Sequence, residues 1–132
     1  MAADTLFAKI VRGEIPCHKV WEDDRHLAFL DIRPMKPGHT LVIPKVGVDY
    51  LFDMDPEAYG ALMQAVRTVA RLLKERLQCQ RVVEVVLGYE IAHAHVHLIP
   101  TDSMADLPAL AGGTPTDHAE LGKLAARLRG GT

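Results

Sequence analysis

The apolar positions of this chain follow a helical period in one long stretch, which predicts a single long helix. Asp55, Pro56 and Glu57 open this stretch with an N-cap acceptor, a first-turn proline and a first-turn acid, as helices commonly begin. The apolar residues that follow recur at steps of three and four, which places them on one face: Leu62, Val66, Val69, Leu73 and Leu77.

Shorter apolar stretches bounded by turn residues predict five strands, at residues 18–22, 26–31, 39–44, 81–88 and 93–99. The first two flank Asp23 and Asp24, which favours a hairpin. Two prolines make residues 33–38 a loop and exclude regular pairing there. Because the strands come mostly in hairpins and the helices stand apart from them, we expect an α+β fold with an antiparallel sheet.

Two short helices complete the predicted elements. Residues 5–12 form one, which Gly13 ends. Asp117 and Glu120 stand in capping-box spacing and start the other, near the C-terminus. This second helix carries its apolar residues on one face: Leu121, Leu124 and Leu128.

His93, His95 and His97 alternate with Ala94, Val96 and Leu98 in the last predicted strand. Residues two apart share one face of a strand, so we expect three imidazoles in a row with the apolar side chains packed behind them. We expect the ring of His95 to be exposed on this face. A half-buried strand needs no histidine on its open side, so the pattern indicates that the three histidines have a functional role.

Three interpretations of this histidine row remain open from the residues alone. Imidazole is the commonest metal ligand in proteins, and a His-x-His pair on a strand can share one ion. A neutral imidazole can instead attack an electrophile while its neighbours fix its tautomer and stabilise charge. The row could also be a polar strand face with incidental histidines, although three in register make that reading the weakest.

Composition limits the class of protein. The chain has 132 residues, 48% hydrophobic and 24% charged, which fits one globular domain over 1–132. Its formal net charge of −2 gives no footprint for nucleic acid, and no apolar stretch is long enough to cross a membrane. Cys17 and Cys79 form no Cys-x-x-Cys pair, which argues against a zinc knuckle or a disulfide scaffold. We therefore expect a cytoplasmic protein without membrane or nucleic-acid partners.

Five stretches carry a resemblance to a known family. They are residues 7–16, 20–24, 27–34, 37–45 and 93–100, in this order. Together they resemble the histidine triad (HIT) family, and in particular its bacterial, Hint-like members without zinc-binding cysteines. The match covers about residues 5–100 and leaves 101–132 as a tail with a helix. The resemblance implies a five-stranded antiparallel sheet with one long helix and short terminal helices, which dimerises into a ten-stranded sheet.

The family also implies roles for four histidines. His95 corresponds to the nucleophile that takes the nucleotidyl group as a covalent intermediate. His93 and His97 flank it, orient it and stabilise charge, and His39 corresponds to a fourth histidine beside the triad. The other histidines, which are His18, His26 and His118, match nothing in the family, and we expect them to face solvent.

The nucleotide-binding residues follow from the same resemblance. Asp31 corresponds to the acid that binds the ribose hydroxyls, and Ile32, Phe7 and Ile15 to the apolar wall of the base pocket. An Asp before Arg-Pro is also a common turn former, and from the residues alone the two interpretations of Asp31 are equal.

Two departures from the family pattern affect metal binding and substrate choice. Thr5, Ala8 and Gly47 stand where many bacterial relatives bind a structural zinc, so we expect no metal and no cofactor. Tyr89 stands where the family often has glutamine, and Glu90 falls where the leaving group is contacted. An acid there disfavours an anionic leaving group and could favour an amine.

The resemblance and the residues together predict a nucleotide phosphoramidase or nucleotidyl hydrolase that acts at the α-phosphate of a nucleotide conjugate. The altered loop at Tyr89 and Glu90 suggests an alternative, a nucleotide-binding or interaction module with low turnover. A metal site formed by the histidine row is a weaker alternative. The expected partners are a small nucleotide substrate and a second copy of the chain.

Overall fold

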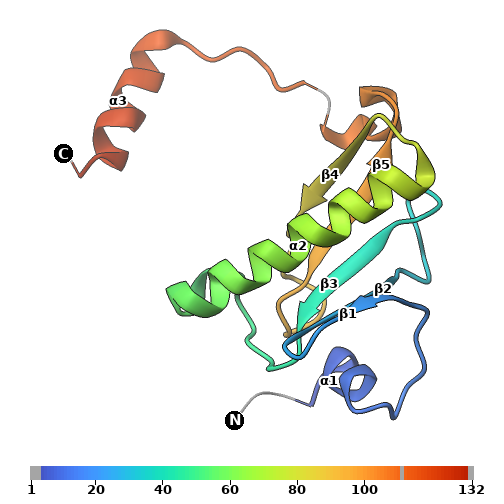
Figure 1. The fold of residues 1–132 in the computed structure, drawn as a ribbon. Coiled ribbons are helices and arrows are strands. Elements are labelled where there is room, and N and C mark those ends of the chain that lie inside the picture. The colour runs from blue at the N-terminus through green and yellow to red at the C-terminus, as the bar shows by residue number, and fades with distance from the viewer. Residues whose placement is uncertain (1–3, 111, 131–132) are drawn as a thin grey trace.

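The computed structural model describes residues 4–110 and 112–130 and contains a five-stranded antiparallel sheet (Figure 1). The strands are β1 (Lys19–Glu22), β2 (His26–Leu30), β3 (Thr40–Pro44), β4 (Arg81–Val85) and β5 (Val96–Thr101). The helices are α1 (Leu6–Val11), α2 (Pro56–Leu77) and α3 (His118–Leu128), with short 3₁₀ turns at Leu51–Asp53, Met104–Asp106 and Pro108–Leu110. The strand order is β1-β2-β3-β5-β4, and the predicted α+β class is confirmed.

The long helix α2 lies across one face of the sheet (Figure 1). The Asp55 carboxylate accepts the Ala58 amide at 2.9 Å, and the helix ends at Gln78, whose φ of 56° is left-handed. Four of the five predicted stripe residues are buried: Leu62, Val66, Val69 and Leu73. Leu77, the last residue of the helix, is exposed instead.

Both faces of the sheet centre are covered, and β2 and β3 are buried at successive positions for this reason. Ala28 and Val42 belong to the core cluster that α2 covers, together with Val96 and Leu98. The intervening residues of β2 and β3 belong to a second cluster, on the opposite face, which includes Phe7 of α1: Leu27, Phe29, Leu41 and Ile43. The predicted packing of Ala94, Val96 and Leu98 behind the histidines is confirmed.

The predicted strand at 93–99 is wrong at its beginning. β5 begins at Val96, so His93 and His95 precede the strand. Its neighbour β3 ends at Pro44, which has no amide hydrogen with which to extend the ladder. The Ala94 amide donates instead to the Val48 carbonyl oxygen, at 2.6 Å. The predicted strand at 81–88 is likewise shorter and ends at Val85.

The β1–β2 hairpin is confirmed, but the expected exposure of His26 is wrong. The Asp23 carboxylate accepts the backbone amides of Arg25 and His26, at 2.8 and 2.7 Å, and closes the turn. The His26 ring is 4% exposed, and its Nδ1 lies 3.0 Å from the same carboxylate. His18 and His118 are exposed, as expected.

Helix α3 stands away from the sheet, at the end of an extended segment (Figure 1). The Asp117 side chain caps it by accepting the Ala119 amide at 3.2 Å, and none of its eleven residues is buried. Its leucines, Leu121, Leu124 and Leu128, are exposed. Among the described residues, no helix has the length and apolar character needed to cross a membrane.

Candidate active site

A cavity of about 520 Å³ opens on the face of the sheet that carries α1. Its surface is mainly apolar and comes from α1, the segment after it, β2, β3 and the segment between β4 and β5. Five residues predicted to bind nucleotide line it: Phe7, Ile15, Asp31, Ile32 and Glu90. His95 and His97 line the same cavity, whereas His93 and His39 do not. A mainly apolar pocket with a few polar groups is the usual form of a small-molecule site.

The strand register explains why His97 points into this cavity. His97 pairs with Leu41 of β3, which pairs in turn with Phe29 of β2. Directly paired residues lie on the same face of a sheet, so His97 shares the face of Leu41 and Phe29, both of which line the cavity.

Among the residues that the structure describes, one ring nitrogen of His95 has a hydrogen-bond partner and the other has none. Its Nδ1 lies 2.8 Å from the backbone oxygen of His93, and a carbonyl oxygen can only accept, so Nδ1 carries the hydrogen. In the neutral ring Nε2 therefore has an available lone pair. The edge of Phe7 packs against this ring, with centroids 4.9 Å apart, and His97 lies on its other side at 5.1 Å. His95 is 7% exposed, so the expectation of an exposed ring is wrong.

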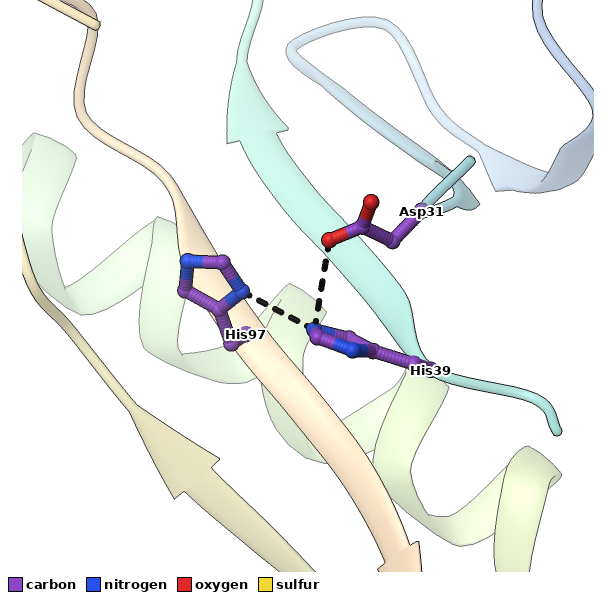
Figure 2. A group of neighbouring side chains, drawn as sticks. All are labelled: Asp31, His39 and His97. Atoms are coloured by element: carbon purple, nitrogen blue, oxygen red, sulfur yellow. Dashed lines mark hydrogen bonds and ion pairs between the residues drawn. The ribbon is translucent and has the colours of Figure 1, made fainter. Parts of the chain in front are cut away.

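His39 and His97 form a hydrogen-bonded pair beside Asp31 (Figure 2). The Met35 amide donates to His39 Nδ1 at 3.1 Å, so the hydrogen of the neutral His39 ring is on Nε2. That Nε2 lies 2.9 Å from His97 Nδ1 and 3.5 Å from Asp31 Oδ2. His97 Nδ1 therefore accepts, and its own hydrogen is on Nε2. A backbone amide thus determines the tautomers of two rings in series.

Burial keeps the rings of His39, His93 and His97 neutral. Burial lowers the pKa of His97 to about 4, with smaller contributions from His95 and His39, while Asp31 acts in the opposite direction. Burial likewise lowers the pKa of His39, against the opposing effect of Asp31. For His93, burial lowers the pKa, and the hydrogen bond to the Pro44 oxygen opposes this. Near neutral pH all three rings are donor–acceptor groups rather than cations.

Asp31, His39 and His97 bring three potential metal-ligand atoms within 4.8 Å of one another. The hydrogen bond from Met35 argues against a metal there. A histidine bound to a metal through one nitrogen normally donates its other N–H to an acceptor. His39 instead receives a hydrogen bond at Nδ1, so metal binding through Nε2 would require that contact to break. The donor set therefore fits a hydrogen-bond relay better than a metal site.

His93 lies behind the cavity and is 1% exposed. Its Nε2 donates to the Pro44 oxygen at 2.8 Å, and its Nδ1 lies 3.2 Å from Thr5 Oγ1. Both ring nitrogens are engaged by the protein, so the weaker prediction of a metal held by the whole histidine row has no support in this geometry. We expected three imidazoles in a row on one face. In the structure the three rings have different surroundings.

Asp31 combines the two interpretations that the sequence left open. Its Oδ1 accepts the Arg33 amide at 2.8 Å, which makes it a turn former, while its Oδ2 faces His39 at the cavity. Two further contacts could not be predicted from the sequence, namely the Met35 amide on His39 and the Thr5 hydroxyl at His93. A backbone amide leaves no signal in a sequence, and Thr5 indicated only a helix start.

Comparison with known proteins gives the family. The family model described as the HIT domain matches residues 12–104. The chain is 32% identical over 105 residues to the purine nucleoside phosphoramidase of Escherichia coli K12, covering 75% of this chain and 88% of that protein. It is 34% identical over 102 residues to the adenylylsulfatase HINT3 of Arabidopsis thaliana, covering 74% of this chain and 52% of that protein.

A solved structure from Streptococcus mutans UA159 matches with a TM-score of 0.86 and 34% identity, over 98% of this chain and 85% of that one. The fold is thus shared over nearly the whole of this chain and not only over the sequence motifs. The chain belongs to the HIT domain family.

Proposed function

We propose that this chain is a nucleotide phosphoramidase, a hydrolase that cleaves the bond between the α-phosphate of a nucleotide and an amine. The observation that carries the proposal is the free Nε2 of His95 at the cavity, with Nδ1 held by the His93 oxygen at 2.8 Å. An oriented imidazole with its lone pair towards a ligand cavity is suited to covalent catalysis.

The cavity has the composition that a mononucleotide requires. Its apolar wall, with Phe7, Ile15 and Ile32, suits the base. Asp31 retains acceptor capacity beyond its bond to the Arg33 amide and its 3.5 Å contact with His39 Nε2, because a carboxylate has about four lone-pair positions. In our proposal this capacity receives the ribose hydroxyls. The α-phosphate then lies over His95 and His97, the two imidazoles that line the cavity.

The reaction proceeds in two displacements. His95 Nε2 attacks the α-phosphorus, a P–N bond to the ring forms, and the P–N bond to the amine breaks. The bound phosphate is negative and favours protonation of the nearby His97, whose Nε2–H then passes a proton to the departing amine. Water next attacks the phosphorus and gives a proton to His97 Nε2, and the P–N bond to His95 breaks, which releases the nucleoside monophosphate and restores His95.

Glu90 makes amines the favoured leaving group. It lines the cavity with Tyr89, in the segment between β4 and β5 that follows the short β4. A carboxylate next to the leaving-group position repels a second phosphate or a sulfate and attracts an ammonium group. The name of the Escherichia coli relative, a purine nucleoside phosphoramidase, agrees with this preference, whereas adenylylsulfatase, the name of the plant relative, implies a different leaving group.

The experiment compares hydrolysis of an adenosine phosphoramidate, a dinucleoside polyphosphate and adenylyl sulfate by the wild type, His95→Ala and Glu90→Gln. We expect the phosphoramidate to be the best substrate, and His95→Ala to lose turnover of all three. In Glu90→Gln, the ratio of kcat/KM for the phosphoramidate to kcat/KM for each of the other two substrates should fall by about tenfold. The substitution removes one repulsion between like charges. Nucleotide binding with no turnover by the wild type would support the interaction module instead.

A further inference from the structure

The position of the His95 ring depends on a backbone oxygen that lies outside regular structure. His93 precedes β5, so no strand pairing fixes its carbonyl group. That oxygen nevertheless lies 2.8 Å from His95 Nδ1 and determines which nitrogen of His95 faces the cavity. The residue after His93 is held by the hydrogen bond from the Ala94 amide to the Val48 oxygen. A further contact must hold His93 itself.

The His93 side chain supplies this contact, because both of its ring nitrogens are bound inside the protein. Nε2 donates to the Pro44 oxygen at the end of β3, at 2.8 Å. Nδ1 is consequently an acceptor in the neutral ring, and the only hydrogen-bond partner recorded for it in the described part of the chain is Thr5 Oγ1, at 3.2 Å. The ring therefore joins the end of a central strand to the start of α1.

Thr5 makes two hydrogen bonds with one hydroxyl. Its oxygen accepts the Ala8 amide at 3.0 Å and caps α1, while its hydrogen is free to donate to His93 Nδ1. Phe7, two residues further along the chain, makes T-shaped contacts with the rings of both His93 and His95, with centroids 5.9 and 4.9 Å apart. The start of α1 thus contacts the histidine segment from two directions.

We propose that Thr5 is a positioning residue for His95: its hydroxyl holds the His93 ring, and the His93 carbonyl oxygen thereby holds His95 Nδ1. The inference rests on the proposed function in one respect, that His95 is the nucleophile. Thr5 itself does not line the cavity and touches no substrate. Its effect is on the rate of the covalent step and not on nucleotide affinity.

A kinetic comparison of three variants separates this role from simple helix capping. Thr5→Val removes both hydrogen bonds, Thr5→Ser keeps both, and Ala8→Gly weakens α1 by an amount similar to the loss of a cap while leaving Thr5 in place. We expect Thr5→Val to lower kcat about tenfold with KM within about twofold of the wild type, because the nucleophile is misoriented. Thr5→Ser and Ala8→Gly should stay within about twofold in both parameters.

The opposite pattern would overturn the proposal. If Thr5 only caps α1, Thr5→Val and Ala8→Gly should behave alike, with kcat and KM changed by similar factors in the two variants. An unchanged kcat in Thr5→Val would contradict it as well.

Nitrogen-15 NMR of the histidine rings in the wild type tests the contact without any turnover. We expect His93 in the Nε2–H form at neutral pH, with Nδ1 as a hydrogen-bond acceptor and a slowly exchanging Thr5 hydroxyl proton. A rapidly exchanging hydroxyl, or His93 in the Nδ1–H form, would overturn the proposal even if Thr5→Val fails to fold. If the wild type shows no hydrolase activity but gives these NMR signals, the proposed function is refuted and the hydrogen bond between Thr5 and His93 is still supported.

Discussion

At the scale of single residues, the site depends on which nitrogen of each imidazole bears the hydrogen. The His93 oxygen fixes His95, and the Met35 amide fixes His39 and through it His97. The contacts to His95 and His39 use backbone groups, which cannot change their role as donor or acceptor, whereas His97 is set through the His39 ring. The tautomer of His95 therefore does not depend on the protonation of a neighbouring side chain, and its Nε2 is available before a ligand arrives.

Burial of these neutral rings makes the stability of the protein depend on pH. The pKa of His97 is about 4 in the folded protein and near ~6.5 in an unfolded chain. The unfolded state therefore binds more protons between these values, and the stability that is complete above pH ~6.5 is lost as the pH falls towards 4. We expect His97 to account for about 1–3 kcal/mol of this loss.

Urea unfolding at pH 7 and pH 4.5 measures this effect. The wild type should lose stability between the two, and His97→Asn should lose less because it has no imidazole to protonate at that position. His118→Gln removes an exposed imidazole from α3 and serves as the matched control. Equal losses in His97→Asn and the wild type would show that His97 is not a source of the pH dependence.

Residue types predicted the members of the site better than their surroundings. The alternating histidines drew attention to residues 93–97, and the family resemblance supplied the predicted pocket residues, which line the cavity. The sequence did not show that His93 turns away from the cavity, because that depends on Thr5 and Pro44, which are 88 and 49 residues distant. Contacts over such separations depend on the tertiary fold and not on local pattern.

At the scale of elements, the loop between β2 and β3 sets the position of His39. Gly38 in this loop has a φ of 94°, which is strained for any other residue. A Cβ there would lie 2.5 Å from Leu77 Cδ1 and 3.2 Å from Pro100 Cγ. The end of α2 and β5 therefore pack closely against this turn. The same turn positions the Met35 amide that donates to His39 Nδ1.

Gly38→Ala should therefore lower the free energy of unfolding by about 1–3 kcal/mol, from backbone strain and the close contacts. Gly60→Ala is the matched control, because a Cβ at this position in α2 meets nothing within 4 Å. It should be neutral or stabilise by up to about 1 kcal/mol. Thermal or urea unfolding of both variants provides the measurement, and equal effects would contradict the close packing of the turn.

Helix boundaries followed from the sequence more closely than strand boundaries did. Asp55 and Asp117 cap helices where their residue types predict, since a cap is a local interaction. Strands β4 and β5 are shorter than predicted because a strand ends where its partner ends, and Pro44 stops β3. Apolar alternation continues past that point in the sequence and therefore overestimates the strand.

At the scale of the whole molecule, apolar or unpaired surfaces remain open in the described part of the chain, among them one edge of the sheet and one face of α3. β4 forms one edge of the sheet and pairs only with β5, and the leucine face of α3 contacts no core. The alanine-rich side of α2, formed by Ala58, Ala61, Ala65 and Ala70, is only partly free, because Ala65 is buried in the core of the same chain and Ala70 packs against it. The edge of β4 is the better candidate for pairing.

We expect two copies to pair through β4 across a two-fold axis and join their sheets into one of ten strands. Sedimentation should then give a mass near twice 14.5 kDa at micromolar concentration, and amides of β4 should exchange slowly. A species of 14.5 kDa alone, with rapid exchange along β4, would contradict the dimer.

The central claim is that His95 Nε2 forms a bond to the phosphorus of a nucleotide. Rapid-quench mass spectrometry with an adenosine phosphoramidate tests it most directly, because it detects the bond itself. We predict one added adenylyl group, within the first turnover, on the peptide that contains residues 93–100. His95→Ala should show no such addition while it still binds AMP. Turnover in the wild type without any adenylylated peptide, or undiminished turnover in His95→Ala, would contradict the account.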